Sequence, residues 1–215
     1  MQELVNLTAI VLSSSPIGEY DKRVVLLTKE RGKITAFARG ARRQTSKLMA
    51  ATNLFAFGEF KLYPGRTSYT LTDAHIQNYF EELRVDFEGA YYGMFFLEVC
   101  DYYTRENNDE KEMLKLLYQS LKALLVKSLN RKLVQCIFEM KALVINGEFP
   151  GMPTDGNWQE STEFAVNYIM NSTIEKLYTF TVSDTVLSEM IRISERYRMR
   201  YIDREFKSLE MLSVL

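Results

Sequence analysis

The chain has 215 residues, 47% of them hydrophobic, so it can bury a core without disulfide or metal staples. Its two cysteines, Cys100 and Cys136, are too few and too far apart for a disulfide framework or a four-cysteine metal site, and we expect buried thiols. The first residues lack the basic leader of a signal peptide, and no apolar run approaches the roughly 20 residues that span a bilayer. These features predict a protein of the reducing cytoplasm with no membrane partner.

Charge is distributed unevenly along the chain, although the net charge is only −1. Residues 1–72 carry eleven Lys and Arg against five Asp and Glu, whereas the remainder carries 16 against 23. Because a field of one sign attracts ligands of the other, this pattern predicts two modules with different partners. Uneven solvation of the surface is the alternative interpretation.

Three segments with β-strand character begin the chain. Leu4–Ser14 contains the apolar and β-branched run TAIVL and is expected to end at the turn formers that follow it. Glu19–Thr28 is the second predicted strand. The third, Lys33–Arg39, alternates, with Ile34, Ala36 and Ala38 on one face and polar or aromatic side chains on the other.

A short helix and a hairpin complete the first part of the chain. Ser46 is placed to cap a helix over residues 47–51. Phe55–Tyr63 and Ser68–Ile76 are joined by Pro64, Gly65 and Arg66, a sequence that favours a tight turn. Five strands with a short helix between the third and the fourth match the order of an OB-fold, although another small barrel would give a similar pattern.

A cluster of cations follows the third strand. Arg39, Arg42, Arg43 and Lys47 fall within nine residues that contain no acidic residue. Such a cluster at a strand end predicts a surface that binds phosphates, to which Lys22, Arg23 and Lys33 would contribute. The alternative is a solvated face whose arginines bond to barrel carbonyls.

Three aromatic residues of the same region are candidate platforms for stacking of nucleic-acid bases. They are Tyr20, Phe37 and Tyr69. Each could instead belong to the barrel core, an alternative that is stronger for Tyr69 than for Phe37.

After about Gln77 the apolar residues recur at helical spacing. Two aromatic segments are expected to be helical, Tyr79–Phe87 and Tyr91–Tyr103. Two stripes of apolar residues predict the core helices Leu114–Leu125 and Leu133–Val144. Three further helices are expected at Glu160–Met170, Thr185–Tyr197 and Arg204–Leu212. Asn130 is a predicted N-cap, and Asn146-Gly147 is expected to end the second striped helix. The fold class is therefore α+β, with a five-stranded barrel at 1–77 and an all-helical domain at 78–215 that docks on it.

Catalytic and metal-binding patterns are not found. The lone His75 lacks a nearby nucleophile or a second ligand, and no cysteine pair has metal-ligand spacing. Asp109, Glu110 and Glu112 form an acidic helix start, which the helix dipole explains without chemistry. The sequence predicts a protein that is not an enzyme and holds no cofactor.

Residues Ser13–Leu48, SSSPIGEYDKRVVLLTKERGKITAFARGARRQTSKL, resemble the N-terminal signature of the bacterial RecO family of DNA-repair recombination mediators. The resemblance rests on the blocks LTxExGK at Leu27–Lys33 and ARGARxxxSxL at Ala38–Leu48. The family's central helix and the turn after it resemble Phe138–Pro150, FEMKALVINGEFP. Its C-terminal segment is similar to Arg204–Leu212, REFKSLEML.

One departure from the family pattern concerns zinc. Many members carry a four-cysteine site after that central turn, whereas 150–180 contains no cysteine here, which resembles the members without the metal. We therefore expect no zinc site, with packing of Trp158 and Phe164 taking over its cross-linking role.

The resemblance implies a role without catalysis in the RecF pathway. It implies binding of single- and double-stranded DNA, annealing of complementary strands, engagement of the C-terminal tail of the single-stranded DNA-binding protein (SSB), and action with RecR to load RecA. No small-molecule substrate is implied.

The SSB tail ends in acidic and apolar residues, so its receptor should be an apolar pocket with a cationic rim. The predicted rim is Lys122, Lys127, Arg131 and Lys132, each of which is otherwise an ordinary helix-surface residue. Two other functions remain open: a barrel scaffold that binds proteins and not nucleic acid, and a hydrolase using the helical carboxylates.

Overall fold

The computed structural model describes residues 3–214. The chain forms two compact units. The first runs to Glu81 and includes Leu97–Leu114, and the second comprises Glu82–Phe96 and the residues from Lys115 onward. We refer to them as the barrel unit and the helical unit.

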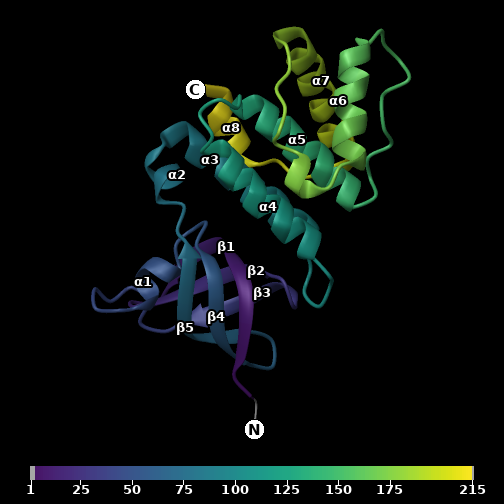
Figure 1. The fold of residues 1–215 in the computed structure, drawn as a ribbon. Helices are drawn as coiled ribbons and strands as arrows, with labels where there is room; N and C mark the ends of the chain where they lie inside the picture. Colours follow the sequence, from purple (N-terminus) through teal and green to yellow (C-terminus); the bar gives the residue numbers. More distant parts are fainter. Residues whose placement is uncertain (1–2, 215) are drawn as a thin grey trace. The chain divides into compact units, whose positions relative to one another are not determined.

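Five strands of the barrel unit close into a barrel in the order β1-β2-β3-β5-β4, with β4 pairing back onto β1 (Figure 1). The strands are β1 Val5–Ile17, β2 Asp21–Thr28, β3 Gly32–Ala38, β4 Phe57–Pro64 and β5 Tyr69–Asn78. Only the β3–β5 pair is parallel among these neighbours. The short helix α1, Leu48–Ala51, follows β3. The predicted α+β class and the five-stranded OB-fold barrel are confirmed.

The alternation predicted for β3 is confirmed. Ile34, Ala36 and Ala38 are buried in the barrel core, whereas Lys33 and Phe37 are only half-buried. Successive strand residues point to opposite faces, so the outward set is available for contacts outside the barrel. The predicted cap is displaced by one residue: α1 begins at Leu48, and its N-cap is Lys47, which makes no side-chain capping bond. Ser46 Oγ nevertheless accepts the backbone N–H of Leu48 at 3.3 Å.

Strand β1 is longer than predicted. It continues to Ile17, because Ser13–Ile17 pair with Val25–Asp21 of β2 after a register shift between Val11 and Ser13. The β1–β4 pairing covers only Val5–Ile10, so this extension has a partner strand on one side. Pro16 is tolerated there because a strand edge does not require every backbone N–H for the ladder.

The remaining elements are helical. They are α2 Glu81–Val85, α3 Phe87–Tyr103, α4 Lys111–Leu124, α5 Arg131–Ile145, α6 Glu160–Asn171, the short 3-10 helix η1 Ile174–Lys176, α7 Asp184–Tyr201 and α8 Lys207–Val214. Among the described residues, η1 is the helix that the sequence did not predict. Asn130 caps α5 by accepting the N–H of Lys132 at 2.9 Å, and Asn146 follows its last residue, as predicted.

Aromatic and apolar side chains fill the core of the helical unit. Phe96 stacks on Phe138 with ring centroids 4.1 Å apart, and Phe95 meets Phe206 edge-on at 5.4 Å. Both cysteines, Cys100 of the barrel unit and Cys136 of the helical unit, are buried as predicted, and burial raises the pKa of both thiols. They are therefore neutral packing groups at physiological pH.

Charged side chains are also buried in this unit, and their polar atoms are bonded. Glu139, 4% exposed, accepts bonds at Oε1 from Gln135 Nε2 and Arg198 Nη1, each at 2.8 Å, and at Oε2 from the Ser194 hydroxyl. Lys141, 8% exposed, donates to three carbonyl oxygens at the end of α6, at 2.8–3.1 Å. Such bonding offsets the cost of removing a charge from water.

Candidate nucleic-acid interface

A row of side chains crosses the outer face of four barrel strands. Arg23 of β2 lies opposite Phe37 of β3, Phe37 lies beside Thr70 of β5, and Thr70 lies opposite Tyr63 of β4. Partners in register point to the same face of a sheet, so these four side chains form one surface. Arg23 is exposed, Phe37 half-buried, and Tyr63 48% exposed. We call this the barrel row.

The cation cluster that follows β3 is bonded to the turn between β1 and β2. The Arg42 backbone N–H donates to the Tyr20 carbonyl at 2.8 Å, and Gly40 N–H to Asp21 Oδ1 at 2.7 Å. Gly40 has a φ of +65°, a conformation that favours glycine. The residues ARGAR therefore hold the loop in a defined position, and two of them do so through the backbone.

The arginine side chains of this loop differ in their partners. Arg42 Nη1 donates to the carbonyls of Gly18 at 3.2 Å and Glu19 at 3.0 Å, yet the residue remains exposed. The Arg43 guanidinium lies over the Tyr20 ring, 4.9 Å from its centroid, and Tyr20 is 42% exposed. This cation–π pair presents a positive charge and an aromatic surface side by side.

Arg39 and Lys47 are exposed, and their side chains make no hydrogen bond or ion pair with any of residues 3–214. Arg23 makes one long contact, from Nη2 to Thr35 Oγ1 at 3.5 Å. These three cations are free to bind an anion without first breaking a strong internal bond. Together with Arg43, and with Arg42, which stays exposed while bonding to two carbonyls, they are the predicted phosphate contacts that the structure leaves accessible.

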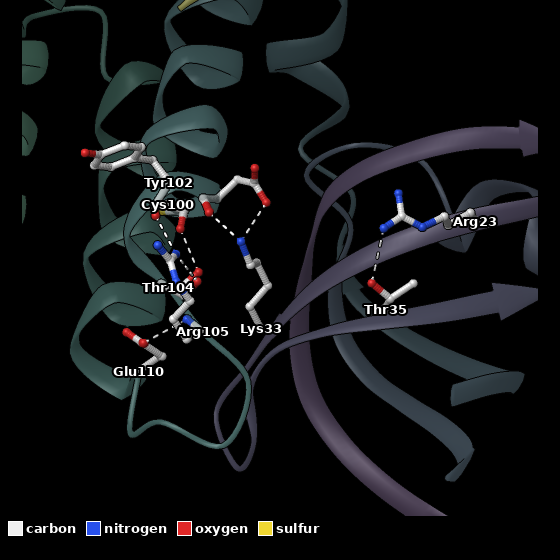
Figure 2. A network of polar contacts seen from close by, with 9 residues as sticks. Arg23, Lys33, Thr35, Cys100, Tyr102, Thr104, Arg105 and Glu110 are labelled. Atoms are coloured by element: carbon white, nitrogen blue, oxygen red, sulfur yellow. Dashed lines mark hydrogen bonds and ion pairs between the residues drawn. The ribbon is translucent and has the colours of Figure 1, made fainter. Parts of the chain in front are cut away.

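Lys22 and Lys33, by contrast, bond within the fold. Lys22 Nζ donates to Thr52 Oγ1 at 3.0 Å and Asn53 Oδ1 at 3.3 Å, just after α1. Lys33 Nζ forms an ion pair with Asp101 Oδ1 at 3.0 Å, and its side chain is 22% exposed. Figure 2 shows the Lys33 ammonium pointing toward α3, whereas Arg23 lies beside Thr35 on the strands.

The ion pair of Lys33 belongs to a larger contact between β3 and the residues after α3. Lys33 N–H donates to the Arg105 carbonyl at 3.0 Å. Arg105 N–H in turn donates to Glu110 Oε1 at 3.1 Å, as Figure 2 shows. A Cβ at Gly32 would lie 2.2 Å from the Arg105 carbonyl oxygen, so only glycine permits this approach. Lys33 therefore serves the packing of the barrel unit.

Tyr69 belongs to the barrel core. It is 7% exposed, and its hydroxyl accepts a bond from Arg31 Nη1 at 3.0 Å. Two further residues of the barrel unit were not predicted from the sequence as binding residues. Tyr63 lies near the end of β4, and the exposed Arg66 lies in the turn between β4 and β5. The signal was present in YPGRTSY, where a cation lies between two aromatic residues.

Comparison with known proteins identifies the family. The family model for the N-terminal part of recombination protein O matches residues 1–80, and the model for its C-terminal part matches residues 84–152. The chain belongs to the RecO family. It is thus a DNA-repair protein of this family, and the resemblance read from the motifs is confirmed.

Curated relatives named DNA repair protein RecO align over most of the chain. The relative from Acetivibrio thermocellus is 26% identical over 97% of this chain and 96% of its own length. The relative from Alkaliphilus metalliredigens is 25% identical over 97% and 98%. One from Bacillus mycoides is 28% identical over 72% of this chain and 62% of its own length.

Three of the four predicted rim residues for the SSB tail line one cavity of this RecO protein. Lys127, Arg131 and Lys132 contribute to a cavity of about 730 Å³ in the helical unit, next to the apolar residues Leu124, Leu125, Val126 and Leu129. Glu82, Asp86 and Glu88 also line it, and Arg131 forms ion pairs with Asp86 and Glu88. Lys122 is not among the lining residues, and its Nζ lies 5.9 Å from the centroid of the Tyr118 ring.

The region that is expected from its sequence to lack a zinc site, residues 150–180, is held by other contacts. Among the residues that the structure describes, no three His, Cys, Asp or Glu side chains are grouped as metal ligands. The Trp158 indole donates to the Pro153 carbonyl at 3.1 Å and lies under Arg192. Phe164 is 72% exposed, so its predicted packing role is wrong. The link between α5 and α6 is made instead by the buried Lys141 of α5, which donates hydrogen bonds to three carbonyl oxygens at the end of α6.

No helix in the described part of the chain is long and apolar enough to cross a membrane.

Proposed function

We propose that this RecO protein binds DNA through the barrel row and the adjacent cation cluster and acts as a recombination mediator. The observation that carries the proposal is the placement of Arg23, Phe37 and Tyr63 on one barrel face. The exposed Arg43–Tyr20 pair supports it. Cations bind the phosphates, and aromatic rings stack with bases of any sequence.

This arrangement suits single strands and strand annealing. Each phosphate neutralised on a single strand adds about 0.7 to the logarithmic salt slope of binding. Each stacked base adds about 1–3 kcal/mol. Binding that depends on charge and stacking tolerates any sequence, as a protein that anneals arbitrary complementary strands requires. Double-stranded DNA would bind through the cations alone.

Partner binding follows from the family and from the cavity of the helical unit. We infer that the SSB tail binds the cavity lined by Lys127 and Lys132, whose apolar side chains would receive the tail's apolar residues. Action with RecR to load RecA, a cytoplasmic location and a role without catalysis or cofactor are parts of the same proposal. They rest on the family relationship.

The test is a salt titration of binding to a labelled single-stranded oligonucleotide. The triple variant R23A/R39A/K47A removes three accessible cations and should lower the logarithmic salt slope by about 2. The matched control K29A/K111A/K176A removes the same charge from exposed residues elsewhere and should bind as the parent does. Circular dichroism checks that both variants are folded.

The same titration separates a mediator from a scaffold. A protein-binding barrel without nucleic-acid affinity would show no salt-dependent binding in the parent chain. An equal loss in both triple variants would show that net charge alone acts, and would contradict an interface at the barrel row.

A fluorescent peptide of the SSB tail tests the cavity. K127E/K132E should abolish peptide binding because both changes place a negative charge at the cavity wall. K122E makes a change of the same kind at a predicted rim residue outside that cavity, so it should leave binding intact. Loss of binding with K122E alone would move the tail site away from this cavity.

A further inference from the structure

An apolar groove lies in the helical unit, where α6 and α7 run side by side (Figure 1). Its volume is about 510 Å³, and its apolar lining consists of Phe164, Ala165, Tyr168, Phe180, Val182 and Val186. Phe164 is 72% exposed, a costly position for a phenylalanine that has no partner. The DNA-binding and SSB-tail sites proposed above do not include these residues.

The walls of this groove are held in place by internal contacts. Tyr168 packs edge-on against Phe180 with centroids 5.3 Å apart, and its hydroxyl donates to the Lys176 carbonyl at 3.2 Å. On the α7 side, Ser183 Oγ accepts the N–H of Val186 at 3.4 Å and caps the helix. A partner would therefore meet a preformed site and lose little free energy in ordering it.

Acidic residues adjoin several of the residues that line the groove. Glu160 precedes Phe164 by one helical turn, Glu163 is its neighbour, and Asp184 begins α7 next to Ser183 of the lining. All three are exposed and form no ion pair with any residue in the described range 3–214. Two other acidic side chains of this region, Asp155 and Glu175, form ion pairs with Arg196 and Lys115 and add little to the local field. The unpaired Glu160, Glu163 and Asp184 make the field beside the groove negative.

We propose that this groove docks a basic segment of a partner protein. One apolar side chain of the segment would pack beside Phe164, while flanking Lys or Arg residues face Glu160, Glu163 and Asp184. The cavity accommodates one or two side chains. A site of this size fits the anchor residue of a short segment, whereas a stable interface between folded proteins involves about 20–30 residues a side, which argues for a segment rather than a second copy of this chain.

The proposal stands apart from the DNA-binding function. The carboxylates around the groove repel phosphates, so substitutions here should leave oligonucleotide binding at the barrel row unchanged. A loss of peptide binding at the groove with unchanged oligonucleotide binding, or the reverse, would therefore show which of the two proposals fails.

The experiment is selection of a phage-displayed library of random peptides on the full chain, with counter-selection on F164A. Recovered peptides should carry an aromatic or aliphatic residue flanked by Lys or Arg, and should bind more weakly at high salt. By fluorescence anisotropy, F164A should weaken binding about tenfold, as expected for an aromatic anchor. E160Q/E163Q should weaken it about threefold.

The matched control is F87A, which truncates another exposed phenylalanine of the same unit outside the groove and should leave peptide binding unchanged. Recovery of only acidic or neutral peptides, or of peptides that bind F164A and the parent equally, would overturn the proposal. A concentration-dependent dimer in sedimentation velocity that F164A abolishes would assign the groove to a second copy and would also overturn it.

Discussion

Two cations of the helical unit and two of the barrel unit have opposite relations to their surroundings. In the helical unit, Arg198 and Lys141 are largely buried and bond to a carboxylate and to three carbonyls. In the barrel unit, Arg39 and Lys47 are exposed and bond to no described residue. A buried charge must be compensated inside the fold, whereas an uncompensated charge at the surface keeps its capacity for a ligand. Accessibility, rather than the number of basic residues, thus distinguishes structural from binding cations.

The strongest test of this contrast removes Glu139. E139A leaves the Arg198 guanidinium and the Ser194 hydroxyl without their acceptor, and breaking a buried pair on one side costs about 3–5 kcal/mol. We expect a fall of that size in the free energy of unfolding, measured by urea denaturation. DNA binding of the folded fraction should not change.

The matched variant for Glu139 is the double substitution E139L/R198M. It replaces both charges by apolar side chains of similar size, so neither charge is left buried alone, and it should be clearly more stable than E139A. If the double variant is as unstable as E139A, packing and not charge compensation explains the loss.

A second, smaller effect is expected at Phe37. F37A should weaken binding to a single-stranded oligonucleotide by about 1–3 kcal/mol, because it removes the aromatic surface at the centre of the barrel row. Equilibrium titration of a labelled strand measures the loss. F164A truncates an exposed phenylalanine of the helical unit and should bind DNA as the parent does. Unchanged affinity in F37A would assign Phe37 to packing on the barrel alone.

The smallest effect separates Lys33 from its basic neighbours. K33M removes a partly exposed ion pair with Asp101 and should lower the free energy of unfolding by about 1 kcal/mol. It should leave the salt slope of DNA binding unchanged, in contrast to R39A. A drop in that slope for K33M would mean that the ion pair opens and that Lys33 reaches the phosphate backbone.

Much of the fold follows from local sequence patterns. The alternation in Lys33–Arg39 and the turn formers around Pro64 and Gly65 predict strands and a hairpin from neighbouring residues alone, and the helical stripes do the same for α4 and α5. The motif blocks identify the family, and the charge pattern locates the basic module. The cation cluster was visible for the same reason, since its members are close along the chain.

Which of these residues remain accessible was decided by tertiary structure. Lys33 meets Asp101, which is 68 residues away in the sequence, and Lys22 meets Thr52, 30 residues away. No local pattern shows such partners. Tyr63 joins the barrel row only through pairing of β4 with β5. Phe164 is exposed because it lies on the face of α6 opposite the buried residues Val166 and Ile169. Short-range order sets the elements, whereas contacts between distant residues determine which charges and rings are left for a ligand.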